Sequence, residues 1–149
     1  MIVRKCVAIA WIGAIPLLSG CRAPVVDPAT VEQLRLTPYP SNAPFRGDLD
    51  IVVRRERGIL VLVNRTARTY DNVQLWLNQQ HVGLATQVRI GGENRFELSN
   101  FINEHGEPYP IGGLLTPEET FPIVSVEMFD PVTGARYRLL VRSRKTLFG

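Results

Sequence analysis

The chain has 149 residues, and its 17 basic and 14 acidic side chains give a formal net charge of +3. This small excess does not favour a nucleic-acid partner, because proteins that bind nucleic acids are usually far more basic. The length suits one small domain, which can bury roughly two thirds of its unfolded surface. The sequence contains two cysteines, Cys6 and Cys21.

The first 20 residues have the three parts of an export signal. Arg4 and Lys5 provide the positive start, an apolar run covers residues 7–18, and the small residues Ser19 and Gly20 follow. The run is about a dozen residues long, whereas a helix that crosses a bilayer needs roughly 20. We therefore expect a cleaved signal peptide rather than a membrane-spanning helix.

The sequence Leu18-Ser19-Gly20-Cys21 resembles the lipobox of bacterial lipoproteins. The resemblance implies cleavage between Gly20 and Cys21, a diacylglyceryl thioether on Cys21 and an acylated new amino terminus. Two or more acyl chains hold a protein firmly, because each buried methylene contributes about 0.8 kcal/mol. The alternative is an ordinary secretory signal in which Cys21 is incidental.

The residue after the lipidated cysteine bears on location. In enteric bacteria an Asp at this position retains a lipoprotein in the inner membrane, and this chain has Arg22 there. The resemblance therefore implies a lipid-anchored protein of the bacterial cell envelope, in the outer membrane and facing the periplasm.

Cleavage changes the composition of the working protein. Removing 20 of the 149 residues leaves 129, and losing Arg4 and Lys5 lowers the formal net charge from +3 to +1. Cys6 is lost with the signal and Cys21 is modified by lipid, so no disulfide is expected within one mature chain.

Residues 21–47 are expected to form a lipidated tether, and residues 48–149 the folded domain. Prolines remove a backbone donor and favour extended geometry in the preceding residue, so a segment rich in them is a semi-rigid spacer of about 3 Å per residue. Such a spacer would hold the domain tens of ångströms from the membrane. Residues 30–36 are left open, as one helical turn or an edge strand. The prolines of the tether are Pro24, Pro28, Pro38, Pro40 and Pro44.

From residue 48 onward, short β-rich runs alternate with turns. This pattern predicts an all-β fold, an antiparallel β-sandwich. We expect Gly58 to supply a positive φ in the first hairpin turn, residues 81–90 to form one strand or two, and Ser99 to cap a short helix over residues 99–103. The expected strands are residues 49–54, 59–64, 72–78, 81–90, 95–98, 121–129 and 135–141.

Two strands carry the clearest information on burial. Residues 59–63 are apolar on both faces and are expected to form a covered central strand. In residues 72–78 the apolar Val73, Leu75 and Leu77 alternate with polar positions, and Trp76 lies on the polar face. Trp76 is expected either to cover the sheet or to mark a contact surface.

The segments Leu62-Val63-Asn64-Arg65-Thr66 and Asp71-Asn72-Val73-Gln74-Leu75-Trp76-Leu77 are similar to a strand pair of small immunoglobulin-like domains of bacterial envelope proteins. Val126-Glu127-Met128-Phe129-Asp130 partly resembles the motif of the FxLYD group, with Val126 and Met128 where Phe and Leu would stand. The resemblance implies an immunoglobulin-like fold, and it implies no activity.

Catalysis needs a nucleophile with a base, paired carboxylates or a metal cluster, and the mature sequence shows none of these in a recognised spacing. We predict that the protein is not an enzyme and needs no metal or cofactor. The alternative is a metal-dependent envelope hydrolase that uses Glu104, His105 and Glu107.

The remaining candidates are surfaces for a partner. Arg136, Arg138 and Arg142 share one face of the last expected strand and could contact an envelope protein or anionic lipid. The alternative is a solvated sheet face. The sequence thus predicts a lipid-anchored binding or structural module, or an accessory subunit of an envelope assembly, with Trp76 and these arginines as its possible contacts.

Overall fold

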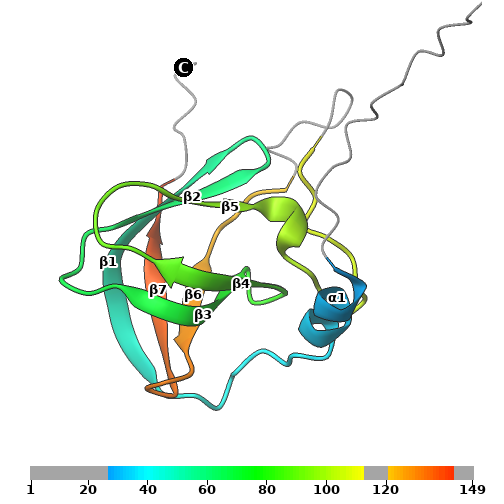
Figure 1. Cartoon of the computed structure of the whole chain (residues 1–149), viewed down its shortest axis with the longest axis horizontal. Coiled ribbons are helices and arrows are strands. Elements are labelled where there is room, and N and C mark those ends of the chain that lie inside the picture. The colour runs from blue at the N-terminus through cyan, green and yellow to red at the C-terminus, as the bar shows by residue number, and fades with distance from the viewer. Residues whose placement is uncertain (1–26, 113–120, 143–149) are drawn as a thin grey trace, which may run out of the picture.

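The computed structural model describes residues 27–112 and 121–142 (Figure 1). One short helix precedes a seven-stranded sheet with the order β4-β3-β6-β7-β1-β2-β5. The residues of the expected signal peptide, 1–20, and Cys21 lie outside the described residues. The elements are α1 (Pro28–Arg35), β1 (Phe45–Glu56), β2 (Ile59–Asn64), β3 (Tyr70–Leu77), β4 (His81–Val88), β5 (Asn94–Glu97), the 3-10 helix η1 (Leu98–Asn100), β6 (Val126–Asp130) and β7 (Ala135–Val141).

The prediction of an all-β fold is confirmed, but the sheet is not purely antiparallel. Strand β1 lies between β7, to which it is parallel, and β2, to which it is antiparallel. It pairs with β7 from Phe45 onward and with β2 only from Ile51 onward. Because one long strand pairs on both sides, the strands form a single sheet.

The strand predictions hold for most elements, and the turns differ in detail. In the β1–β2 turn the positive φ of 55° belongs to Arg57, whereas Gly58 has none. Residues 81–90 give the one strand β4, and β6 is shorter than the expected 121–129. The short helix is the 3-10 turn η1, which Glu97 precedes without a side-chain cap, so the expected cap at Ser99 is wrong.

The main core lies on one face of the curved sheet. Val73, Leu75 and Leu77 of β3 point into it, which confirms the alternation read from the sequence. Leu60 and Leu62 of β2 join them, and Val61 is fully buried on the opposite face, as expected for a covered strand.

Asn64, the last residue of β2, joins β2 to two neighbouring segments, the β2–β3 loop and the end of β4. Its side-chain nitrogen donates to the carbonyls of Arg68 at 2.8 Å and Val88 at 3.0 Å. Its side-chain oxygen accepts from the backbone N–H and the hydroxyl of Thr66. Asn64 is fully buried, and its partners satisfy a polar side chain that would otherwise be costly to bury.

Helix α1 begins at a cap and covers a second, smaller core. Asp27 accepts a hydrogen bond from the backbone N–H of Thr30, and Pro28 occupies the first turn, where its missing N–H costs nothing. Leu34 is the one buried residue of the helix. It packs with Trp76, Val82 and Ile102 on the face of the sheet opposite the main core.

The predicted tether of residues 21–47 therefore differs from the structure over residues 28–47, which contain α1 and the start of β1. From Pro28 the chain forms α1, crosses the sheet and enters β1 at Phe45. The prolines that suggest a spacer instead begin a helix at Pro28 and shape the crossing that follows it. No helix within residues 27–112 and 121–142 has the length and apolar character needed to cross a bilayer.

Candidate functional site

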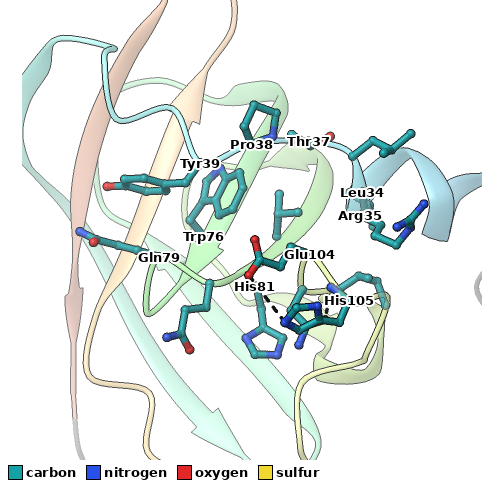
Figure 2. A pocket seen from close by; sticks show the side chains of 15 residues that line it. Leu34, Arg35, Thr37, Pro38, Tyr39, Trp76, Gln79, His81, Glu104 and His105 are labelled. Atoms are coloured by element: carbon teal, nitrogen blue, oxygen red, sulfur yellow. Dashed lines mark hydrogen bonds and ion pairs between the residues drawn. The ribbon is translucent and has the colours of Figure 1, made fainter.

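A cleft of about 550 Å³ lies beside α1, and we call it the α1 cleft. Three segments line it: residues 34–39 from the end of α1 onward, Trp76 with residues 79–82 of the β3–β4 hairpin, and residues 102–105. Figure 2 shows Tyr39 and Trp76 at one end of the cleft and Arg35 and His105 at another. The volume is within the usual range of about 300–1,000 Å³ for small-molecule sites.

The segment after α1 is fixed by a buried ionic cluster. The hydroxyl of Tyr39 donates to Glu127 Oε2 at 2.6 Å, and Arg136 Nη1 donates to the same oxygen at 3.0 Å. Arg136 also donates to the backbone carbonyls of Ala43 and Ser41, at 3.1 and 3.2 Å. We call residues Tyr39, Glu127 and Arg136 the Arg136 cluster. It ties residues 36–44, which we call the crossing segment, to β6 and β7.

The charges of this cluster are enclosed. The side chains of Arg136 and Glu127 are 15% and 7% exposed. Burial would raise the pKa of Glu127, but hydrogen bonds from Tyr39 and Gln79 and the charge of Arg136 outweigh it and leave the pKa below 4.5. Burial and the adjacent Glu127 carboxylate raise the pKa of Tyr39. The carboxylate is therefore ionised and the phenol protonated at neutral pH.

Trp76 is not a surface residue. It is 3% exposed, and its ring meets the edge of Tyr39 at 84° with the centroids 5.3 Å apart. Its indole nitrogen donates to Gln74 Oε1 at 3.2 Å. The interpretation of Trp76 as an exposed contact surface is therefore wrong: the indole lies under α1, and part of it lines the α1 cleft.

The loop on the other side of the cleft is shaped by Asn103. Its side-chain oxygen accepts from the backbone N–H groups of His105 and Glu107, at 3.0 and 2.9 Å, and its nitrogen donates to the Glu107 carboxylate. The loop also packs on β4, since a Cβ on Gly83 would lie only 2.7 Å from the ring of Phe101. These contacts set the position of residues 102–105.

His81 begins β4 and lines the α1 cleft. Its ring meets the edge of Tyr109 with the centroids 5.0 Å apart. Its Nδ1 atom is buried and has no hydrogen-bond partner within the described residues. Burial lowers the pKa of His81 below 6.5, and the negative charge of Glu107 offsets this only in part. A neutral imidazole has one ring nitrogen that donates a hydrogen bond and one that accepts.

The three arginines grouped by the sequence have different roles. Arg136 is a structural cation inside the Arg136 cluster and is not available to a partner. Arg138 and Arg142 are exposed, and the Arg138 guanidinium lies 5.3 Å from the ring centroid of Phe45. Asp48 lies opposite Arg138 in the β1–β7 register, which reduces the positive field of this face.

The residues of the alternative metal site do not converge on one point. His105 and Glu104 form an exposed pair with a nitrogen–oxygen distance of 3.6 Å, and Glu107 is bound to Asn103 instead. Among the residues that the structure describes, no three His, Cys, Asp or Glu side chains are grouped to hold a metal ion.

No protein family, curated protein or solved structure matches this chain. The chemistry of the α1 cleft therefore follows from the side chains that line it. The α1 cleft offers amide groups of Gln79 and Gln80, the imidazole of His81 and an aromatic end. Such groups hold a polar ligand by hydrogen bonds and ring contacts. Sequence reasoning did not find this site, although Val31 and Leu34, three residues apart on a helix, are a signal that the segment docks.

Removing the guanidinium of Arg136 tests the ionic cluster. Arg136→Ala leaves Glu127 buried without its cation and frees the crossing segment, so we expect a loss of about 3–5 kcal/mol in the free energy of unfolding. Arg138→Ala on the same strand is the matched control and should change stability by less than about 0.5 kcal/mol. Urea denaturation followed by tryptophan fluorescence measures both. Equal losses of unfolding free energy in Arg136→Ala and Arg138→Ala would contradict the structural role of Arg136.

His81 should make stability depend on pH. As the pH falls through about 6.5, the unfolded chain gains a proton on His81 that the folded chain takes up only at lower pH, so folding stability decreases. His81→Gln should reduce the loss of stability between about pH 7.5 and 5.5. His105→Gln, which alters an exposed imidazole, is the control and should behave like the unaltered chain. If the pH dependence of folding stability is unchanged in His81→Gln, His81 is not its cause.

Proposed function

We propose that the protein is a lipid-anchored, non-catalytic binding module of the bacterial cell envelope. The lipobox-like Leu18-Ser19-Gly20-Cys21, preceded by a charged and apolar leader, supports the anchor. The residue Arg22 favours the outer membrane, with the domain in the periplasm. The fold proposed for that domain is an immunoglobulin-like β-sandwich in which the single sheet bends so that its two ends face each other across the main core.

The observation that carries the binding role is the α1 cleft. It is lined by parts of the chain that are distant in sequence, and each is held by its own contacts: the Arg136 cluster for residues 39–43 and Asn103 for the loop. A cleft fixed from several sides is preorganised, which lowers the entropic cost of binding. Its lining combines the amides of Gln79 and Gln80 with imidazoles and charged groups, among them Arg35 and Glu104, and suits a polar ligand or peptide.

The anchor is tested by replacing the modified cysteine. Cys21→Ala should move the protein from the membrane fraction to the soluble fraction and abolish incorporation of labelled palmitate. The fold should be unchanged, because Cys21 lies ahead of α1 in the sequence and belongs to none of the elements of the domain. Cys6→Ala, a change within the leader, is the control and should keep the anchor. A Cys21→Ala protein that stays in the membrane would contradict the proposal.

The binding role is tested by photo-cross-linking in the host. A photoreactive residue in place of Gln80, which is exposed and lines the cleft, should capture a discrete envelope component. The same residue in place of Ala67, exposed on the β2–β3 loop, is the control and should not capture it. The same adduct from both positions, or none from Gln80, would argue against the α1 cleft as a binding site.

A further inference from the structure

The length of chain between the anchor and the folded domain limits how the domain can sit on a membrane. The first described residue is Asp27, which caps α1, and the proposed lipidation site is Cys21, six residues earlier. A fully extended chain covers at most about 3.3–3.6 Å per residue, so six residues reach about 20 Å. This step rests on the proposed lipidation of Cys21.

Residues 28–44 cannot lengthen this tether while they stay docked. Leu34 is 3% exposed in the second core, and Tyr39 is held by Glu127 and Arg136. The backbone N–H of Arg136 also donates to the carbonyl of Pro44 at 2.9 Å. The spacer of tens of ångströms expected from the prolines is therefore replaced by a short one.

The domain is wider than this tether is long. A compact domain of its size has a radius of gyration of about 13 Å, and hence a diameter of roughly 35 Å. If the end opposite α1 faced the bilayer, Asp27 would lie farther from the membrane than the tether can reach. The loop between β2 and β3 is at that opposite end (Figure 1).

We propose that the α1 end of the domain lies against the phospholipid surface that carries the anchor, with Asp27 within about 20 Å of the head groups. The surface at this end fits such a partner. Leu36, next to the cleft, is 65% exposed, and an interfacial lipid layer would cover it. Arg35 is already paired with Glu32 at 2.7 Å, so the contact does not require anionic lipid.

The test places one dye at each end of the full lipidated chain. Single cysteines at the exposed positions Gln33, in α1, and Ala67, in the β2–β3 loop, are labelled in separate variants. Each is then reconstituted into phosphatidylcholine and phosphatidylethanolamine vesicles that contain a head-group quencher. Because the acylated Cys21 has no free thiol, the introduced cysteine alone reacts.

We expect several-fold stronger quenching at Gln33 than at Ala67. A flexible Gly/Ser insertion of 30 residues between Ala23 and Pro24 should abolish the difference, since such a chain has a root-mean-square span of about 30 Å. Equal quenching of the two positions in the lipidated chain without the insertion would overturn the orientation and leave the anchor intact. Mass spectrometry that shows an unmodified Cys21 would overturn both the anchor and the orientation.

Discussion

The ion pair between Glu127 and Arg136 is the interaction on which the arrangement of the site depends. Two charges on adjacent antiparallel strands, both largely removed from water, are costly unless each has further partners. Tyr39 and Gln79 supply them to Glu127, and the carbonyls of Ser41 and Ala43 supply them to Arg136. The bonds that satisfy the pair are the same bonds that dock the crossing segment. Without that docking, α1 would have no fixed position over the sheet and there would be no α1 cleft.

The sheet explains why a helix is needed on this face. Strand β3 places Val73, Leu75 and Leu77 in the main core, so Trp76 necessarily points to the other side. An indole left there in water would be a large exposed apolar surface. Leu34 and Tyr39 cover it, and the part of the face that they do not fill, between the β3–β4 hairpin and residues 102–105, is the cleft. The candidate site is therefore a consequence of how the second face of the sheet is covered.

The sequence predicts the strands well because a period of two is a local signal. It does not separate Arg136 from Arg138, which occupy equivalent places in that pattern and differ only in tertiary partners. The partners of Arg136 lie far away in the chain: Tyr39 is separated from it by 97 residues and Ala43 by 93. Helix α1 has eight residues, fewer than an isolated helix needs to be stable, so its existence depends on packing that no local pattern contains. The parallel pairing of β1 with β7 likewise joins residues that are far apart in the chain, so no local pattern predicts it.

If the α1 cleft binds a ligand as proposed, docking of the crossing segment and binding would be coupled. Fixing the backbone of each residue costs about 1–2 kcal/mol of conformational entropy, so docking of residues 27–44 has a large entropic cost. The packing of Leu34 and Tyr39 and the hydrogen bonds of the Arg136 cluster offset this cost. A ligand that touches both residues 34–39 and the β3–β4 hairpin can bind only when the segment is docked. Such a ligand would stabilise the docked state by mass action, and a contact that raises the populated fraction of the docked state would in turn strengthen binding. Glu127 and Arg136, which do not line the cleft, thereby influence its affinity through Tyr39.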